Sequence, residues 1–388
     1  MSEVRIAGIG LTHFGEQPAR TGRDLFAEAG LTALDDSGVN PDDIEALHYG
    51  NFMGELAEHQ GHQGPLMAEA VGLSVPATRF ETACASSGVA LREAVKNIRN
   101  GESDVLLVGG AERMTNMDTQ GATEGLAIAA DDLYEVRAGA TFPGVYAMMA
   151  RAYFEEYGGD REDLAHIASK NHENAIPNEY AQFQREVSVE EVLEAPMVAD
   201  PLGMFDACPI SDGASAVVLV SEEYATDHGI DAPVAITGTG QGGDRMALAD
   251  REFLARTPAA ERAAEEAYAD AGIGPDDIDI AEVHDCFTIA EVMALESLGM
   301  YEPGEAIGAA RRGETTRDGS LPVNVSGGLK SKGHPVGATG VGQIADLTKL
   351  LSGIHPRSED VPDVQVGIAH NAGGTVASAM VHVLEVVE

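Results

Sequence analysis

Two patterns of apolar residues alternate along this chain. Continuous apolar runs, such as the one between Asp104 and Gly109, are typical of strands covered on both faces of a sheet. Between such runs, apolar residues recur every three or four positions, as at Phe26, Ala29 and Ala33, and this spacing predicts amphipathic helices. A chain in which strands alternate with helices is expected to form an α/β fold.

Part of this pattern occurs twice. Residues 33–44 recur as residues 267–278, 234 positions further along, and the strand-like residues 4–10 are echoed by residues 234–240. A period of half the chain predicts a duplicated domain, because solenoids repeat roughly every 20–50 residues. The chain has 388 residues, 44% of them hydrophobic, which is enough for two cores.

The helix boundaries in the two copies carry matching signals. Thr21 and Thr257 are predicted N-caps, and Pro258 suits the first helical position. Gly38 and Gly272 suit the residue that follows each helix. We therefore expect each half to contain a strand, a helix and a second strand in the same order.

The segment between the copies has no counterpart in the second half. It contains two helix-like stretches, Pro143 to Tyr157 and Glu162 to Ala175, and we interpret it as an inserted loop domain, a common place for substrate contacts. The predicted organisation is a first half at residues 1–112 plus 205–230, a loop domain at residues 113–204, and a second half at residues 231–388.

Acidic residues dominate the polar positions. The chain has 64 Asp and Glu residues against 24 Lys and Arg residues, a formal net charge of −40, spread along its whole length. At multimolar salt the Debye length falls to about 3 Å or less, so self-repulsion is screened while the carboxylates keep the surface hydrated. This composition predicts a salt-loving host. It argues against nucleic acid as a partner, because phosphate binding needs basic stripes.

The cysteines and the apolar stretches indicate a cytoplasmic protein. Cys84, Cys208 and Cys286 are widely spaced, which argues against a disulfide framework. Residues 1–5 show no signal-peptide pattern. The longest stretch without acidic or basic residues, Val364 to Leu384, contains amides and two histidines and is a poor membrane span.

Cys84 is the first candidate for chemistry. It lies in the segment from Phe80 to Gly88, where a strand is expected to end and a helix to begin. A cysteine at a helix N-terminus is favoured as a thiolate by the local positive potential, and the small neighbouring residues would let a substrate approach. The alternative is a small buried cysteine without a chemical role.

The matching turn of the second half contains His334. This turn runs from Asn324 to Gly340 and is followed by another helix with an apolar stripe. The duplicated halves can therefore bring Cys84 and His334 to one cleft, and a cysteine beside a histidine is an activated-nucleophile arrangement. A histidine in a glycine-rich loop, taken alone, is more often structural.

Three further residues stand at expected strand ends. His284 and Cys286 follow an expected strand and, being two positions apart, would share one face of it. His370 follows a strand expected from Val364 to Ala369. Each has an alternative interpretation as a hydrogen-bonded strand-end residue. Cys208 is interpreted as structural, because no base can be named for it.

Together these segments resemble the thiolase superfamily over essentially the whole chain. The block around Cys84 resembles the nucleophile motif of that family, and Gly333-His334-Pro335 with the following Gly337-Ala338-Thr339-Gly340 resembles its second catalytic motif. Ser211-Asp212-Gly213-Ala214 matches a further family stretch. The resemblance implies a thiolase fold with two duplicated halves in a five-layered αβαβα arrangement and an inserted loop domain.

Two motifs depart from most thiolases. This chain has His284-Asp285-Cys286-Phe287 where most members have Asn-Glu-Ala-Phe, and His370-Asn371-Ala372 where most have Cys-x-Gly. Both variants resemble the sterol-carrier-protein type and the archaeal acetyl-CoA acetyltransferases. The second acid/base cannot then be the usual late cysteine, because no cysteine follows Cys286.

The resemblance implies chemistry on coenzyme A thioesters without a further cofactor or metal. His334 would help to deprotonate Cys84, whose thiolate would attack a thioester, and a second base would let another acetyl-CoA attack the acyl enzyme to give acetoacetyl-CoA. Cys286 and His370 compete for the role of second base, and we favour Cys286.

Two oxyanion holes are needed. We assign the first to His334 with a water held by His284. We assign the second to the backbone N–H of Cys84 with one from the turn that comprises Ala372, Gly373 and Gly374.

The resemblance also suggests partners. Members of the family are usually homodimers or tetramers, and the archaeal type works with a 3-hydroxy-3-methylglutaryl-CoA synthase through an OB-fold protein that carries a zinc ribbon. Lys330 and Lys332, close to His334, are weak candidates for contacts with the phosphates of coenzyme A.

Three alternatives stay open at this point. The first is a zinc site formed by Cys84, Cys286, His284 and His334, although the close cysteine pairs that usually build one are missing. The second is a β-ketothiolase for longer acyl chains, and the third is a non-catalytic scaffold that binds acyl-CoA. Neither the reaction direction nor the pathway follows from the sequence, and isoprenoid synthesis, polyhydroxyalkanoate supply and β-oxidation are all compatible with it.

Overall fold

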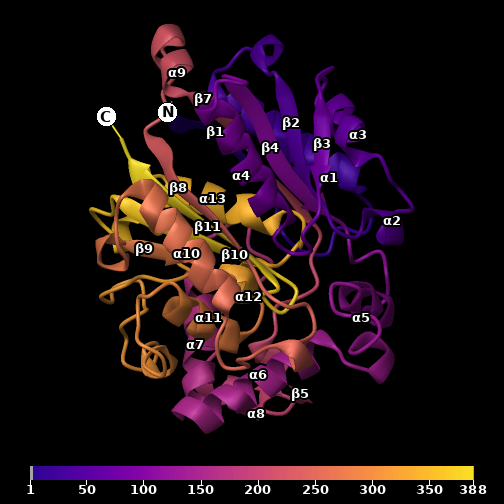
Figure 1. The fold of residues 1–388 in the computed structure, drawn as a ribbon, viewed down its shortest axis with the longest axis vertical. Helices are drawn as coiled ribbons and strands as arrows, with labels where there is room; N and C mark the ends of the chain where they lie inside the picture. The colour runs from indigo at the N-terminus through magenta and orange to yellow at the C-terminus, as the bar shows by residue number, and fades with distance from the viewer. Residues whose placement is uncertain (1–2, 388) are drawn as a thin grey trace.

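A mixed sheet runs through the whole molecule in the computed structural model, which describes residues 3–387 (Figure 1). Within these residues the sheet has nine strands in the order β3-β2-β4-β7-β1-β8-β11-β10-β9. Its first five are β3 (Ala77–Phe80), β2 (Ala46–Gly50), β4 (Val105–Glu112), β7 (Gly213–Ser221) and β1 (Val4–Leu11). The other four are β8 (Val234–Gly243), β11 (Ser378–Val386), β10 (Val366–Gly373) and β9 (Ile280–Glu282).

The two halves of the sheet share one strand pattern and meet at β1 and β8. In the first half β2 pairs parallel with β3 and β4, whereas β4, β7 and β1 pair antiparallel. In the second half β9 and β10 pair parallel, whereas β10, β11 and β8 pair antiparallel. Only Arg5↔Ala235 and Ile6↔Val234 are paired between β1 and β8. The duplicated pattern expected from the sequence is therefore present in the fold.

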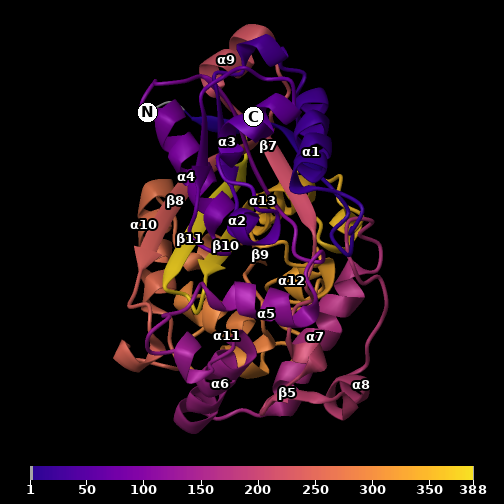
Figure 2. The same ribbon diagram turned by 90° about the vertical axis from the view of Figure 1, so that its right-hand side faces the viewer.

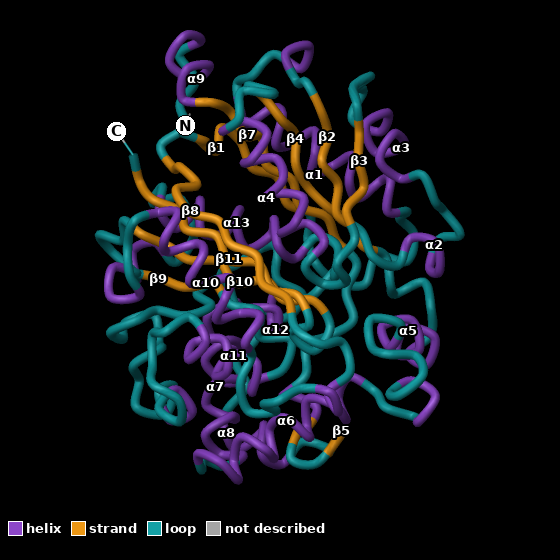
Figure 3. Tube along the Cα trace, viewed as in Figure 1, coloured by secondary structure: helices purple, strands orange, loops and turns teal. Residues whose placement is uncertain are grey.

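Helices separate and cover the two half-sheets, giving five layers. The middle layer consists of α4 (Ser86–Arg99) and α13 (Thr339–Leu351), whose apolar residues pack in one core with strand residues of both halves (Figure 1). The outer layer of the first half is α1 (Gly22–Ser37) with α3 (Gln63–Ala70), and that of the second half is α10 (Pro258–Ala271) with α11 (Thr288–Ser297). Figure 3 shows the strand groups in orange with these helices packed against them. This is the αβαβα arrangement that the resemblance implied.

The segment between the halves lies at the end of the molecule opposite the two termini (Figure 2). The two predicted helices occur there as α6 (Phe142–Tyr157) and α7 (Arg161–Ala175). The remaining α-helices and β-strands of the described residues are α2 (Gly54–Ala57), α5 (Thr119–Ala127), α8 (Val189–Glu194), β5 (Met197–Ala199), β6 (Leu202–Gly203), α9 (Glu222–His228) and α12 (Gly328–Lys332). Among residues 3–387, no helix combines the length and the apolar character needed to cross a bilayer.

The predicted helix boundaries of α1 and α10 are confirmed, except that Thr257 does not act as an N-cap. Thr21 caps α1 through its hydroxyl in a capping box, and Gly38 and Gly272 end α1 and α10 in the left-handed conformation. Thr257 stands at the N-cap of α10 but does not cap it. Its hydroxyl lies 2.6 Å from the buried hydroxyl of Ser297 instead. The prediction for Thr257 was wrong because a tertiary partner is available in the core.

Two strand boundaries near the site also differ from expectation. β10 continues to Gly373, so His370 and the two residues after it belong to the strand, because they pair with β11. β9 ends at Glu282, so His284 and Cys286 lie in the connection to α11 rather than on one face of a strand.

Candidate active site

The turn between β3 and α4 carries Cys84. Ala83 takes φ of 51°, in the left-handed region that non-glycine residues rarely adopt. The Ser86 hydroxyl donates to the carbonyl of Ala83 and accepts from the backbone N–H of Thr82 at 3.0 Å. Such strained positions cluster at functional sites, and here the hydrogen bonds of Ser86 hold the turn.

Three side chains from distant parts of the chain converge at this turn. The thiol of Cys84 and one ring nitrogen each of His284 and His334 lie within 4.8 Å of one another. The two imidazole rings meet edge to face, with centroids 4.9 Å apart and an interplanar angle of 87°. The structure thus brings Cys84 and His334 together, as the two matching turns predicted, and places His284 beside them, where the assignment of the first oxyanion hole requires it.

A largely apolar pocket of about 190 Å³ opens onto Cys84 and His334. Cys286 lines it, together with Cys208, for which the sequence suggested only a structural role. The remaining wall is mostly apolar and comes from the loop segment and from both halves: Thr123, Leu126, Ala129, Phe142, Pro143, Ala207, Ile210, Phe287 and Gly374.

Hydrogen bonds select the tautomer of His334. Its Nδ1 lies 2.7 Å from the hydroxyl of Thr339, and that hydroxyl donates to the carbonyl of Pro335 at 3.0 Å. With the single hydroxyl proton used there, Nδ1–H of His334 is the donor to Thr339. The other nitrogen, Nε2, then carries a lone pair and has no hydrogen-bond partner among the described residues. It is free to accept a proton from a neighbouring thiol.

Burial keeps the resting site uncharged. Although part of the Cys84 residue is accessible, burial, with a smaller contribution from the carboxylate of Glu112, raises the pKa of its thiol to about 12. The backbone amides of Gly374 and of Cys84 itself act in the opposite direction. Burial lowers the pKa of His334 to about 3. The expected helix-end thiolate is therefore wrong for the resting protein, because desolvation outweighs the potential at the start of α4.

Cys286 is also buried and shielded from solvent. Burial raises the pKa of its thiol well above the ordinary value, and the nearby hydroxyl of Tyr146 lowers it. Tyr146 is itself buried, donates to the carbonyl of Gly374 at 3.0 Å and stacks on Phe287 with ring centroids 4.6 Å apart. Sequence reasoning missed Tyr146, which lies on a helix of the inserted segment with no motif around it.

His370 occupies a different place. It lines a second, small cavity of about 10 Å³ with His284 and Tyr146, and does not line the pocket that contains Cys84. Both of its ring nitrogens are buried without a partner among the described residues, and burial lowers its pKa to about 4.

Asn371 links the site residues, although the sequence did not single it out for a role. Its side-chain amide donates to the carbonyl of Cys84 and to Nδ1 of His284, at 3.1 Å each. The signal that could have found it is a buried amide at the end of a strand that leads to the site.

Glu112, at the end of β4, is a third residue that sequence reasoning missed. Its carboxylate accepts from the backbone N–H groups of Phe52, Met53 and Gly337 and from the side-chain amide of Asn51. Burial raises its pKa to about 7, and the three backbone N–H groups oppose that rise. Glu112 thereby ties the first half to the loop that follows His334.

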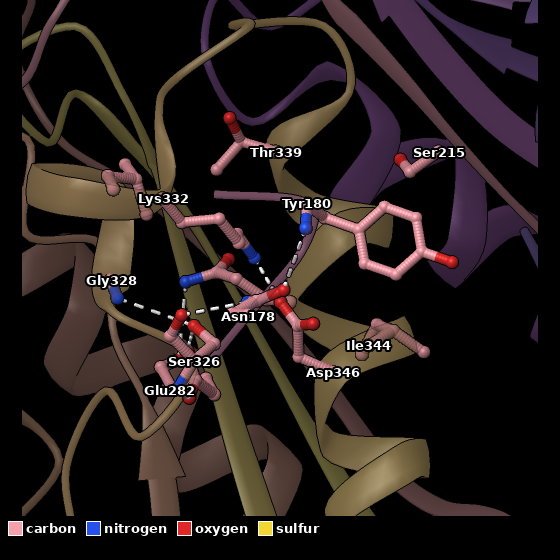
Figure 4. Close-up of polar contacts among 12 residues, drawn as sticks. Asn178, Tyr180, Ser215, Glu282, Ser326, Gly328, Lys332, Thr339, Ile344 and Asp346 are labelled. Carbon is pink, nitrogen blue, oxygen red and sulfur yellow. Dashed lines mark hydrogen bonds and ion pairs between the residues drawn. The ribbon is translucent and has the colours of Figure 1, made fainter. Parts of the chain in front are cut away.

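The two lysines beside His334 do not reach solvent. Lys332 is 2% exposed and forms an ion pair with Asp346 of α13, next to Glu282 and Ser326 (Figure 4). Lys330 is also 2% exposed and points its ammonium at the ring of Phe205, 5.8 Å from the centroid. Contacts of these lysines with the phosphates of coenzyme A are incompatible with this burial, so that suggestion was wrong.

Of the four residues in the alternative zinc site, three have ligand atoms close together and the fourth does not. Cys84, His284 and His334 converge, whereas the thiol of Cys286 is not within that set. Metal analysis of the purified protein tests the prediction that no metal is bound.

The fold and the site together define an enzyme of the duplicated, five-layered α/β class with a candidate cysteine nucleophile. Residues 4–223 match the family described as Thiolase, N-terminal domain, and residues 240–386 match Thiolase C-terminal domain-like. The chain therefore belongs to the thiolase family and is an acyltransferase.

Two archaeal relatives match this chain over nearly its full length. The acetyl-CoA acetyltransferase of Methanothermobacter thermautotrophicus is 43% identical over 384 residues, and that of Methanocaldococcus jannaschii is 42% identical over 394 residues, with 99% of both chains covered in each case. The solved structure named Ltp2-ChsH2(DUF35) aldolase aligns with a TM-score of 0.84 at 27% identity and covers 99% of this chain and 98% of that one.

Proposed function

We propose that this thiolase is an acetyl-CoA C-acetyltransferase that forms acetoacetyl-CoA and CoA from two acetyl-CoA molecules, or catalyses the reverse thiolysis, through an acyl group on Cys84. The observation that carries the proposal is the convergence of the Cys84 thiol with ring nitrogens of His284 and His334 beside an apolar pocket. The names of the two archaeal relatives support acetyl-CoA as the substrate.

In the first step Cys84 exchanges its proton for an acyl group. Nε2 of His334 accepts the thiol proton while the sulfur attacks the thioester carbon, and CoA leaves as the C–S bond breaks and takes the proton from His334. Because burial holds the pKa of the thiol near 12 and that of His334 near 3, a free thiolate–imidazolium pair is disfavoured. Proton transfer is therefore coupled to the attack on the thioester.

In the second step a carbanion attacks the acyl enzyme. Cys286 first releases its thiol proton to solvent, and the thiolate then takes a proton from the methyl group of a second acetyl-CoA. The new C–C bond forms at the acyl carbon, and the sulfur of Cys84 leaves and takes that proton from Cys286. Cys286 lines the pocket with Cys84 and His334, whereas His370 lines a second cavity together with His284. This placement favours Cys286 as the second acid/base.

Two sets of donors would hold the developing oxyanions. We assign the first hole to His334, once it is protonated, with a water bound by His284. We assign the second to the backbone N–H groups of Cys84 and Gly374, both of which lower the pKa of the Cys84 thiol and so lie near its sulfur. The sequence left open which backbone N–H of the turn from Ala372 to Gly374 takes part in the second hole, and we now propose that of Gly374.

Mass spectrometry of the protein after exposure to acetyl-CoA tests the proposal. We expect an added acetyl group on Cys84 and none in Cys84→Ala, together with release of CoA. A panel of acyl-CoAs of increasing length decides between acetyl and longer chains, which the apolar lining of the pocket would also suit. A protein that binds acyl-CoA without acylation would instead be a scaffold.

For the assembly we propose a homodimer or tetramer in the cytoplasm, with acyl-CoA as the small-molecule partner. The solved neighbour's name joins Ltp2 to ChsH2(DUF35), which supports a partner of the OB-fold kind. We further propose that this partner carries a zinc ribbon and connects the enzyme to a 3-hydroxy-3-methylglutaryl-CoA synthase. Co-purification from the native host tests this, and a fully active homodimer that purifies alone would contradict the need for either protein.

The charge of the surface leads to one further expectation. A net charge of −40 repels the phosphates of coenzyme A, and salt screens that repulsion. We expect the Michaelis constant for acetyl-CoA to fall as KCl is raised from about 0.1 M to molar concentrations. A Michaelis constant that does not change with salt would contradict the prediction of a salt-loving enzyme.

A further inference from the structure

One side-chain amide joins the nucleophile turn to the second half of the molecule. Asn371 lies in β10, is 1% exposed, and uses its Nδ2 group for two hydrogen bonds of 3.1 Å. One goes to the backbone carbonyl of Cys84 and the other to Nδ1 of His284. Among the described residues, no other side chain forms hydrogen bonds to both Cys84 and His284.

The first helical turns of the two middle helices leave space for this amide. A Cβ atom at Gly88 of α4 would lie 2.8 Å from Oδ1 of Asn371, and one at Gly340 of α13 would lie 2.6 Å from it. Any side chain at either glycine would therefore displace the amide. Both glycines belong to the motifs around Cys84 and His334, and this close approach gives a physical reason for glycine at these two positions.

The orientation of the amide follows from its partners. The carbonyl of Cys84 can only accept a hydrogen bond, so the NH₂ group of Asn371, and not its oxygen, must face it. The same NH₂ group contacts Nδ1 of His284, which must then be the acceptor. His284 consequently carries its proton on Nε2.

We propose that Asn371 is a positioning residue that keeps His284 in the Nε2–H tautomer and holds the Cys84 turn at a fixed distance from it. Its consequence for catalysis rests on the proposed function, because an Nε2–H group donates to a water or an oxyanion and cannot accept a proton at that atom. The division of roles in the site then has a structural origin. Thr339 leaves His334 with a free lone pair, and Asn371 leaves His284 with a free N–H group.

Nuclear magnetic resonance of the resting protein with ¹⁵N-labelled histidine tests the tautomer directly. We expect long-range ¹⁵N–¹H correlations to show His284 with a proton on Nε2 and none on Nδ1, with the resonance assigned by its loss in His284→Gln. In Asn371→Asp the carboxylate can only accept, so a proton should appear on Nδ1. Asn178→Asp is the matched control: Asn178 is also buried but hydrogen-bonds Ser326 and Tyr180, and the His284 signal should not change.

A wild-type spectrum with the proton of His284 on Nδ1 would overturn the proposal, and so would an unchanged Nδ1 in a folded Asn371→Asp protein. The wild-type spectrum decides even if the variant does not fold. Because the spectrum involves no acyl transfer, its outcome is independent of whether acetyl-CoA is the substrate. If both proposals hold, Asn371→Leu should slow acylation of Cys84 by up to about 100-fold with little change in the Michaelis constant, since the donor is misplaced.

Discussion

The turns that precede α4 and α13 occupy matching places in the two halves, yet they contribute opposite partners to the reaction. The first is short, is held by the Ser86 hydroxyl and presents a thiol. The second is longer, contains α12 and presents a histidine that is anchored by Thr339. The duplication therefore supplies two equivalent positions beside one central layer, and each half has adapted its position to one reacting group.

The two halves also differ in the groups that surround a buried carboxylate. Glu112 in the first half is satisfied mainly by backbone N–H groups. Glu282 in the second half accepts from Ser326 and lies beside the ion pair of Lys332 with Asp346 (Figure 4). Burial raises the pKa of both carboxyls, and the Lys332 ammonium opposes it only for Glu282. N–H dipoles therefore hold Glu112, whereas the dipoles of Ser326 and the charge of Lys332 act together on Glu282.

The largest expected effect concerns Cys84 and Cys208, the two cysteines of the first half that line the pocket. Cys84→Ala should lower turnover by more than about 1,000-fold, because no other described thiol lies in the set with His284 and His334. Cys208→Ala should cost at most about tenfold, through packing alone. Steady-state assays compare them, and turnover of Cys84→Ala within tenfold of wild type would remove the nucleophile assignment.

The second acid/base gives the next effect, of about 100-fold or more. Cys286→Ser should still acylate Cys84 but lose exchange of the acetyl-CoA methyl protons with deuterated solvent. His370→Ala should keep measurable exchange, because His370 lines another cavity. Exchange followed by mass spectrometry separates the two, and the reverse pattern would transfer the role to His370.

Glu112 should make stability depend on pH. Its folded pKa is raised from 4.5 to about 7, so its contribution to the free energy of unfolding is full below pH 4.5 and is lost as the pH rises through 7. That rise in pKa corresponds to on the order of 3 kcal/mol. Relative to wild type, Glu112→Gln should therefore become more stable between pH 5 and pH 8 at constant salt. Urea unfolding at both pH values measures this, and a parallel pH dependence in the two proteins would contradict it.

The two threonines at corresponding helix starts should give the smallest effects. Thr21→Ala removes a capping box and should cost about 1 kcal/mol. Thr257→Ala leaves the buried hydroxyl of Ser297 without its partner and should cost about 1–2 kcal/mol. Thr257→Ser should restore most of that loss. Thermal unfolding ranks these variants, and a Thr257→Ala protein as stable as wild type would show that the hydroxyl pair contributes nothing.

Much of the architecture could be predicted from local pattern. The repeat at residues 33–44 and 267–278, the glycines that end α1 and α10, and the apolar runs predicted a duplicated α/β fold because each signal acts within a few residues. The same local signals placed Cys84 and His334 at two turns of one kind. The boundaries of the inserted domain stay a prediction.

The properties of the site groups could not be obtained in this way. The pKa of Cys84, the burial of Lys330 and Lys332, and the place of Cys208 in the pocket all depend on which surfaces exclude water after folding. The roles of Tyr146, Glu112 and Asn371 depend on partners more than 50 residues away.

The sequence by itself therefore determined the class of fold, the family and the residue types available for chemistry, because these follow from spacing and motif. The tertiary structure decided which nitrogen of each histidine is free, whether the thiol is charged at rest, and which cavity each candidate base lines. These properties arise from desolvation and from hydrogen bonds between distant segments, and neither exists until the two halves have packed against α4 and α13.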